Sequence, residues 1–326
     1  ILHLEEGMDA LVESMNEEGE ELRGRLKEAR RRLKEVRSRR EPPFRDEKVL
    51  TGWNSFMLRA LAEAGAALDH EVYLEAARAN AGFLLGSLRP GGRLHRSWKD
   101  GDVRIPGFLE DHAALGNALL SLHEATLEPA WLLEARSLGD QVLELFWEEE
   151  EGLFYDSPHD GEKLVMRPRE VMDNATPSGN SLAVELLLRL SAVFGEERYR
   201  EVALQALDRE SRALAQLPSA FGRLLSNLSL SQEAPTELVL LGQAGDTGLA
   251  GLRRAAHAPY LPGRVVIGGP PEGLPDLPLL EGRTLRDGKA TGYVCRDFTC
   301  SLPLHDPESL EREIQERAGS PGEASP

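Results

Sequence analysis

An internal repeat constrains the fold of this chain more than any other feature of its sequence. Three windows, 53–77, 111–135 and 179–203, align with one another without gaps. Each window begins with an apolar helical pattern, breaks briefly, and continues as a second helix that opens on Tyr73, Trp131 or Tyr199. Each repeat is therefore predicted to be an αα-hairpin.

The connections between the hairpins are long. Segments 89–94 and 151–156 place glycine ahead of alternating residues that are typical of short strands, and each connection has about 20 residues or more. A repeated unit of helix, helix and long loop is typical of toroidal (α/α) barrels, in which one layer of helices surrounds a cavity. We therefore predict a mainly α fold built from αα-hairpin repeats.

Other patterns flank the repeats. Residues 21–41 carry ten basic and four acidic side chains on an amphipathic helical pattern that stops at Pro42 and Pro43. We interpret this segment as a docked helix with a solvated charged face, in preference to a polyanion-binding arm.

Strand, helix and strand patterns at 237–241, 247–257 and 264–267 predict a small C-terminal α/β appendage. The expected organisation is an N-terminal helical segment (1–43), the hairpin repeats (44–232), an α/β subdomain (233–318) and a disordered tail (319–326).

Charge and composition exclude several classes of function. The 326 residues include 38 basic and 55 acidic side chains, with a formal net charge of −17, so we expect no nucleic-acid and no membrane partner. No uncharged apolar run approaches the roughly 20 residues that span a bilayer. With two cysteines and no leader pattern at its start, the chain is predicted to be cytoplasmic. Motifs such as H-E-x-x-H and the P-loop are absent, so we expect no metal and no cofactor.

Two C-terminal motifs are ambiguous. Cys295 and Cys300 form a C-x4-C spacing, which predicts either a bonded pair or, preferably, two buried thiols. The glycines Gly242, Gly245 and Gly248 follow a predicted strand, but their G-x-x-G-x-x-G spacing disfavours a dinucleotide site.

The starts of the hairpins carry the candidate site. Asn54, His112 and Asn180 occupy the same position in the three repeats, near helix N-termini, where capping alone accounts for a polar residue. In a closed toroid, however, these starts face one cavity. Asp111 and Asp173 are the candidate acid/base carboxyls, because such chemistry requires one protonated and one ionised group.

The remaining candidates lie around this pair in the sequence. His112 is either a catalytic group or a buried histidine with satisfied hydrogen bonds. Aromatic rings offer flat faces to sugar rings, and arginines bind carboxylates or phosphates bidentately. The predicted substrate-binding residues are Trp53, Asn54, Trp98, Arg104, Phe108, Glu110, Arg167 and Asn180.

Several segments resemble those of one family. The segments L-T-G-W-N at 50–54, G-F-L-E-D-H at 107–112 and A-T-P-S-G-N-S at 175–181 resemble L-T-S-W-N-G, G-F-L-E-D-Y and A-x-P-S-G-N-S. These belong to the YyaL-like, spermatogenesis-associated-protein-20-like thioredoxin-domain family. The segment G-K-A-T-G-Y-V-C at 288–295, with F-T-C at 298–300, is similar to its C-terminal signature. Ser55 and His112 depart from the Gly and Tyr that are usual there.

The resemblance implies a thioredoxin-like domain followed by an (α/α)6 toroid of the six-hairpin glycosidase and N-acylglucosamine 2-epimerase type. From its start at Ile1 and its three hairpin repeats, we expect this chain to lack the thioredoxin domain and about half of the toroid. We therefore expect a partial (α/α)6 toroid that is a piece of a longer protein.

Two functions are consistent with these observations. The first is a toroid that processes or binds a sugar-like ligand, with epimerase-like or glycosidase-like acid/base chemistry in a central cavity. The alternative is a non-catalytic interaction module that works with a thioredoxin-like domain or with the missing N-terminal half.

Overall fold

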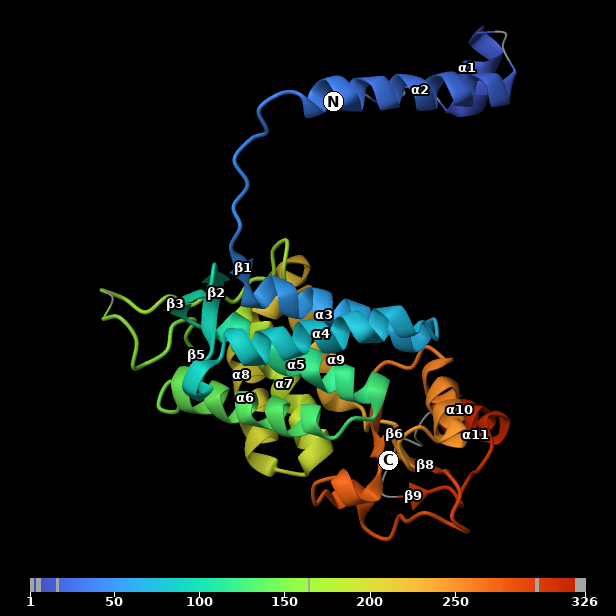
Figure 1. The fold of residues 1–326 in the computed structure, drawn as a ribbon. Coiled ribbons are helices and arrows are strands. Elements are labelled where there is room, and N and C mark those ends of the chain that lie inside the picture. The colour runs from blue at the N-terminus through green and yellow to red at the C-terminus, as the bar shows by residue number, and fades with distance from the viewer. Residues whose placement is uncertain (1–2, 4–6, 16–17, 164, 297–298, 320–326) are drawn as a thin grey trace. The chain divides into compact units, whose positions relative to one another are not determined.

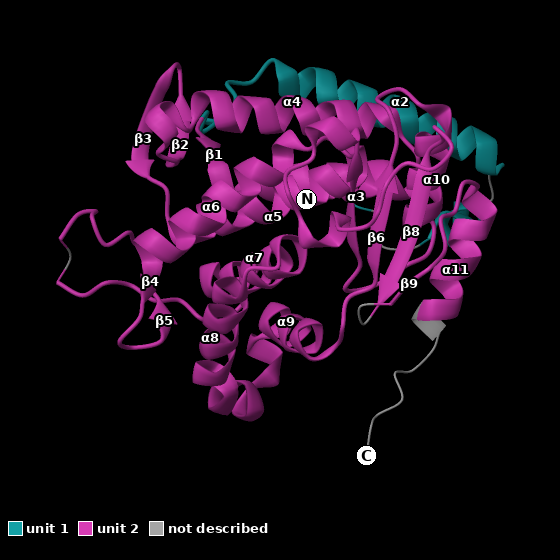
Figure 2. Ribbon diagram, turned by 90° about the horizontal axis from the view of Figure 1, so that it is seen from below, with its two compact units in different colours: residues 1–47 teal, residues 48–326 magenta. Residues whose placement is uncertain are grey.

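A computed structural model describes residues 3, 7–15, 18–163, 165–296 and 299–319 (Figure 1). The chain divides into two compact units, residues 1–47 and residues 48–326, which are coloured separately in Figure 2. Within the described residues, no helix is long and apolar enough to cross a membrane.

Among its described residues, the first unit contains the helices α1 (Met8–Met15) and α2 (Gly19–Ser38). Of the apolar stripe predicted for α2, Leu22 is buried while Leu33 and Val36 are exposed. On the polar side, Glu28 accepts hydrogen bonds from Arg31 and Arg32, one turn further along. Such i,i+3 and i,i+4 pairs stabilise an exposed helix locally.

The second unit contains the three predicted hairpins, and the mainly α fold class is confirmed. The hairpins pair α3 (Thr51–Ala67) with α4 (Glu71–Ser87), α5 (Leu109–Thr126) with α6 (Ala130–Phe146), and α7 (Gly179–Phe194) with α8 (Glu197–Gln216), and α9 (Gly222–Gln232) follows them. The central helix α5 packs against both α3 and α7, and α9 packs against α7. We call α3, α5, α7 and α9 the inner helices.

Local signals set the ends of these helices. Ser178 caps α7, because its hydroxyl accepts a hydrogen bond from the N–H of Ser181 at 3.1 Å, and Gly195 ends α7 at a positive φ. Between hairpins, Gly139 allows close packing: a Cβ there would lie 2.2 Å from Cδ1 of Leu190. The helices thereby approach closely around a core of leucine and alanine.

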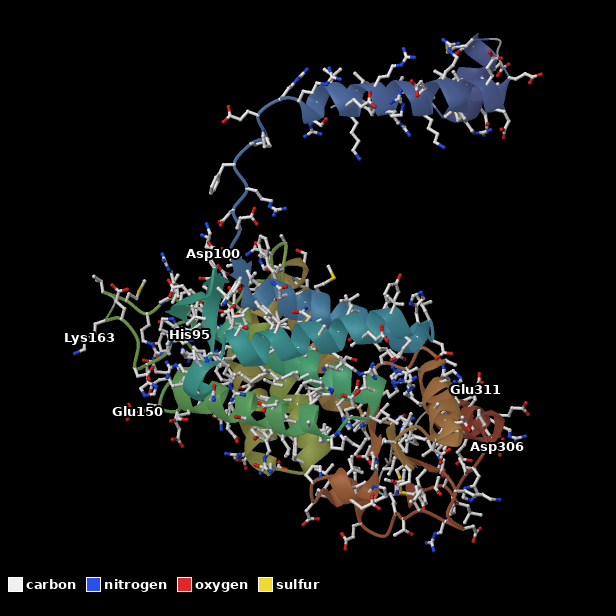
Figure 3. All side chains as sticks on the ribbon, in the orientation of Figure 1. His95, Asp100, Glu150, Lys163, Asp306 and Glu311 are labelled. Atoms are coloured by element: carbon white, nitrogen blue, oxygen red, sulfur yellow. A yellow bond between two sulfur atoms is a disulfide. The ribbon has the colours of Figure 1, made fainter. Side chains whose placement is uncertain are left out.

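The long connections form small antiparallel sheets near the starts of the inner helices. One contains β1 (Val49–Leu50), β2 (His95–Lys99) and β3 (Asp102–Pro106), and the other contains β4 (Trp147–Glu148) and β5 (Leu153–Phe154). In Figure 3, His95, Glu150 and Lys163 mark this end of the unit, and Asp306 and Glu311 mark the opposite end.

The C-terminal part is an α/β subdomain, as predicted. Its elements are β6 (Glu237–Leu241), α10 (Thr247–His257), β7 (Val265–Gly269), β8 (Thr291–Arg296), β9 (Thr299–Cys300) and α11 (Pro307–Gly319). The sheet has the order β7-β6-β8-β9, with β6 parallel to β7 and the other neighbours antiparallel. Most of the predicted tail, residues 320–326, lies outside the described residues.

The subdomain supplies donors to the end of α5. The guanidinium of Arg253 donates to the carbonyl of Ala125 at 2.7 Å, and Nε2 of His257 lies 2.9 Å from the carbonyl oxygen of Glu124. The last carbonyls of a helix have no partner within that helix. Helix α10 therefore satisfies carbonyl groups that α5 would leave open.

The preferred prediction of two buried thiols is wrong. Cys295 and Cys300 form a disulfide, because β8 and β9 pair antiparallel and place the two residues directly opposite each other. The glycine motif is a turn: Asp246 caps α10 by accepting a hydrogen bond from the N–H of Gly248 at 2.7 Å.

Candidate functional site

The first turns of α3 and α5 meet at one buried carboxyl group. Oδ1 of Asp111 accepts a hydrogen bond from the N–H of Gly52 at 3.0 Å, and Oδ2 accepts one from the N–H of Phe108 at 2.9 Å. A Cβ at Gly52 would lie 3.2 Å from Oδ1, so the two helix starts are in close contact. Asp111 therefore caps its own helix and the neighbouring inner helix at the same time.

Two charged side chains and an aromatic ring surround Asp111. Nη1 of Arg96 lies 3.2 Å from Oδ2 of Asp111 and also donates to Glu110, and its guanidinium lies 4.7 Å from the ring centroid of Phe108. Burial raises the pKa of Asp111 to about 6, against the opposing effects of the Phe108 N–H and of Arg96. A carboxyl with this pKa exchanges protons close to neutral pH.

A second carboxyl with a raised pKa, which the sequence analysis missed, lies in the loop after β5. The carbonyl of Asp156 accepts a hydrogen bond from the N–H of Leu109 at 2.9 Å, and its Oδ2 accepts one from the N–H of Glu170 at 2.7 Å. Burial, together with the charges of Glu170 and Glu110, raises the pKa of Asp156 to about 6, against the opposing effect of the Glu170 N–H. No motif marks Asp156, because only folding of the loop brings its partners together.

These groups define one site, which we call the helix-start cluster. Its members come from β2, from the start of α5 and from the connection that precedes α7. They are Arg96, Glu110, Asp111, Asp156 and Glu170.

His112 is fully buried beside this cluster. Its Nδ1 lies 3.0 Å from the carbonyl oxygen of Phe108, its ring packs edge-on against Phe146, and its Nε2 has no partner among the described residues. Burial lowers the pKa of His112 to about 4. The imidazole is therefore neutral, and Nδ1 is the nitrogen that carries the proton donated to Phe108.

Asp173 organises the start of α9. Its Oδ1 accepts a hydrogen bond from the N–H of Ser178, and its Oδ2 accepts one from the N–H of Arg223, both at 2.8 Å. This carboxyl thus fixes the loop before α7 and caps the next inner helix, as Asp111 does for α3. A Cβ at Gly179 would lie 3.1 Å from the backbone N of Glu110, so the start of α7 also lies against the start of α5.

Among the predicted ligand-binding residues, Asn180 is buried and bonded to a member of the cluster. Its Nδ2 donates to the carbonyl of Glu170 at 2.9 Å. Asn54 instead donates to the carbonyl of Leu50, one turn back, and Trp53 is 70% exposed on α3.

Three further candidates lie on the connections rather than in the cluster. Trp98 packs edge-on against Phe83, and Arg104 is exposed and bonded to Asp102 at 2.8 Å. Arg167 lies over the ring of Tyr155, 4.2 Å from its centroid.

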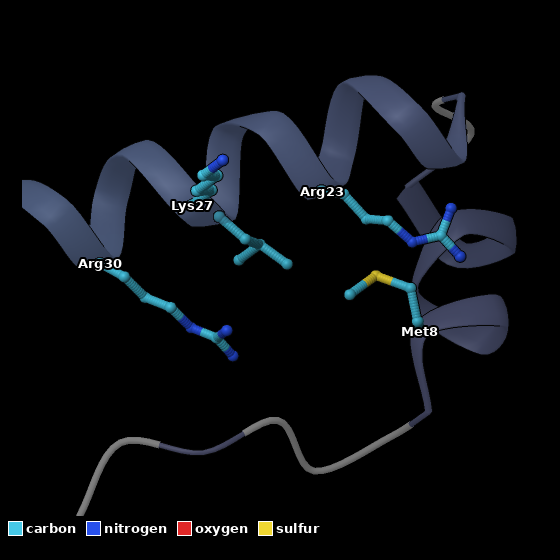
Figure 4. Close-up of a pocket in the computed structure, with 5 residues that line it drawn as sticks. Met8, Arg23, Lys27 and Arg30 are labelled. Carbon is cyan, nitrogen blue, oxygen red and sulfur yellow. The ribbon is translucent and has the colours of Figure 1, made fainter. Parts of the chain in front are cut away.

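Two open pockets lie elsewhere. One, of about 200 Å³, is in the first unit and is lined by Met8, Arg23, Leu26, Lys27 and Arg30 (Figure 4). The other, of about 260 Å³, lies between residues 91–93, α6 and residues 159–160. Within the residues that the structure describes, no group of three or more His, Cys, Asp or Glu side chains is arranged to hold a metal ion.

Comparisons with known proteins identify relatives of the chain. No protein-family model matches it. Human spermatogenesis-associated protein 20 is 32% identical over 290 residues, which are 84% of this chain and 37% of the human protein. The mouse protein of the same name is 32% identical over 83% of this chain and 36% of its own length. The chain thus spans just over a third of the length of these relatives.

Solved structures of two enzymes are also similar to this chain. An alpha-mannanase from Bacteroides thetaiotaomicron has a TM-score of 0.47 and 13% identity, over 85% of this chain and 70% of the enzyme. The cellobiose 2-epimerase from Spirochaeta thermophila has a TM-score of 0.43 and 19% identity, over 50% of this chain and 43% of the enzyme.

Proposed function

We propose that this chain, which belongs to the family of spermatogenesis-associated protein 20, forms part of an (α/α) toroid that processes a carbohydrate. The chemistry proposed is proton transfer at the helix-start cluster, of the kind that an epimerase or a glycosidase performs. The observation that carries this proposal is the Asp111 carboxyl, held between the first turns of α3 and α5 with a pKa of about 6. Such a group both accepts and donates protons near neutral pH.

The neighbouring residues have distinct roles in this proposal. Asp111 exchanges the proton, while Glu110 and Arg96, whose side chains are 37% and 28% exposed, are open to a ligand. The ring of Phe108 offers an apolar face, and Asp156 supplies a second carboxyl of raised pKa. Asp173 acts as a positioning residue, because both of its oxygens hold backbone groups at the start of α9 and in the loop before α7.

The test is a ligand screen with matched variants. The chain is screened by thermal shift against neutral monosaccharides and disaccharides, uronic acids and sugar phosphates, and the best ligand is then assayed for turnover. A ligand at 100 times its Kd adds about 2.7 kcal/mol of stability. Asp111→Asn is expected to abolish turnover, whereas Asp102→Asn, on an exposed strand, is the control. Unchanged turnover in Asp111→Asn would refute the assignment of Asp111.

A second candidate function, the interaction module, is favoured by two exposed side chains near the start of α3. Position 53 is equivalent to 111 and 179 in the repeat, and both of those residues contact the preceding inner helix. Asp111 does so at Gly52, and Gly179 does so at Glu110. Trp53 and, one turn on, Met57 are instead 70% and 57% exposed. Their positions therefore suit a further helix of the same kind.

This candidate is tested by co-purification. The partner is the part of a relative that lies outside the matched segment, with or without the thioredoxin-like domain that the family resemblance implies. Trp53→Asp is expected to weaken the complex at least tenfold, because a buried charge without a partner opposes association. Leu133→Asp, at a half-exposed position of α6, serves as the control. Failure of the unmodified chain to bind either region would exclude the module.

A further inference from the structure

A charge network joins the inner helices beyond the helix-start cluster. On α3, Nε of Arg59 donates to Oε1 of Glu63 at 2.7 Å, and its Nη1 lies 2.8 Å from Oε1 of Glu185 on α7. On α5, the hydroxyl of Ser121 donates to the same Glu63 oxygen at 3.2 Å. Arg189 of α7 donates to Ser121 at 3.2 Å, which completes the connection between the three helices.

The internal repeat accounts for this network. Its members occupy two equivalent positions in each window, four residues apart and therefore on one face of each helix. The first position carries Arg59, Asn117 and Glu185, and the second carries Glu63, Ser121 and Arg189. The charges on α7 are in the reverse order of those on α3. By helical rise, the first position lies about 9 Å from the level of Asp111.

Glu185 differs from every other carboxyl of this network and of the helix-start cluster. Its side chain is 6% exposed, and its Oε2 is buried without a hydrogen-bond partner among the described residues. Its Oε1 faces two guanidinium groups, that of Arg59 at 2.8 Å and that of Arg223 at 3.6 Å. Arg223 is the residue whose backbone N–H is held by Asp173.

The unpaired oxygen of Glu185, Oε2, is unusual for a buried acceptor. Buried polar atoms in proteins are almost always hydrogen-bonded, and an unpaired one is costly. Asp111, also buried, has partners on both of its oxygens. The arginines that flank Glu185 remain 22% and 35% exposed, so these two side chains border solvent. An ionised carboxylate oxygen accepts hydrogen bonds and cannot donate them.

We propose that Oε2 of Glu185 accepts a hydrogen bond from a hydroxyl group of the bound carbohydrate, with Arg59 and Arg223 orienting the carboxylate. This inference rests on the function proposed above and assigns Glu185 as a further ligand-binding residue. The class of ligand it specifies is a neutral polyhydroxylated molecule. A ligand carboxylate or phosphate at this oxygen would be repelled by the like charge.

The test measures affinity for D-glucose, D-mannose, cellobiose and their single-deoxy analogues by titration calorimetry. Glu185→Gln is expected to weaken binding at least tenfold, because a charge-assisted hydrogen bond is lost. One deoxy analogue should bind the unmodified chain as weakly as the parent sugar binds Glu185→Gln, with no further loss when the two changes are combined. Glu134→Gln on α6, which removes the carboxylate paired with the mostly buried guanidinium of Arg89, is the control and should bind normally.

The possible outcomes distinguish failure of the proposed function from failure of the role assigned to Glu185. If no sugar binds the unmodified chain, the proposed function fails and this inference fails with it. If sugars bind and Asp111→Asn abolishes turnover while Glu185→Gln binds normally, the function stands and the inference is overturned. Equal losses in Glu185→Gln and Glu134→Gln would also overturn it. Should Glu185→Gln not fold, Arg223→Gln, at a partly exposed position, replaces it: a two- to fivefold loss supports the inference and unchanged affinity overturns it.

Discussion

Replacing Asp111 by asparagine should change the pH dependence of stability in a direction that the structure fixes. Burial raises the pKa of this carboxyl from 3.8 to about 6. Between those values the folded state binds more protons than the unfolded state, so this group's contribution to stability is complete below pH 3.8 and is lost as the pH rises through 6. The difference corresponds to roughly 3 kcal/mol.

The substitution also changes the hydrogen bonds. Each oxygen of Asp111 accepts a backbone N–H, from Gly52 and from Phe108. Asparagine retains one oxygen and places an NH2 group against the other donor, so one buried N–H loses its acceptor. The expected cost is about 1–3 kcal/mol, and it does not depend on pH.

The assay is urea unfolding of both proteins at pH 4 and pH 7. Because asparagine does not titrate, the deficit of Asp111→Asn should be larger at pH 4 than at pH 7, by up to about 3 kcal/mol. Groups that titrate in both proteins, such as Asp156 with its pKa also near 6, cancel in this comparison. A deficit that is equal at the two pH values would show that folding does not raise the pKa of Asp111, and the role proposed for it in proton exchange would be refuted.

Three further predictions concern other parts of the second unit. Gly139→Ala should cost about 1–3 kcal/mol in thermal unfolding, because the new Cβ would lie 2.2 Å from Leu190, whereas Gly82→Ala, with open space around it, should be neutral or stabilising; equal effects would contradict the packing. Cys300→Ser should lower the free energy of unfolding by about 2 kcal/mol, as expected for the short loop that the disulfide closes, and a reductant should have the same effect on the unmodified chain but none on the variant. Burial lowers the pKa of His112 from 6.5 to about 4, so its contribution to the free energy of unfolding, roughly 3 kcal/mol, is lost as the pH falls through that range. His112→Gln should therefore lose less stability than the unmodified chain when the pH is lowered from 6.5 to 4. An equal loss of stability in the two proteins would refute this.

The repeat explains why much of this fold is predictable from the sequence. Equivalent positions such as Asn54, His112 and Asn180 reveal three hairpins before any tertiary contact is known. The family resemblance noted from short segments is confirmed by relatives that match 84% of the chain. The position of Asp111 at a helix start is likewise evident from the sequence, although its second role, as the cap of α3, depends on packing between helices.

Other features depend on contacts between distant residues. Arg59 and Glu185 are paired across two hairpins, and neither stands out as a member of a motif. Asp156 acquires its raised pKa only when the loop around it folds. The disulfide depends on the register of β8 with β9, which the C-x4-C spacing alone does not specify. Because disulfides are rare in reducing compartments, the cytoplasmic location stays a prediction.

The contact between α10 and the end of α5 has a consequence for the order of events during synthesis. Arg253, whose guanidinium donates to the carbonyl of Ala125, lies 128 residues after Ala125 in the chain, and His257 lies 133 residues after its partner Glu124. A nascent chain that has left the ribosome as far as α9 contains the three described hairpins, but the carbonyls of Glu124 and Ala125 in α5 do not yet have these donors. The hairpins can therefore assemble early, but the final turn of α5 acquires its native hydrogen bonds only after the subdomain emerges. Completion of the helical layer is then a late step of folding during synthesis.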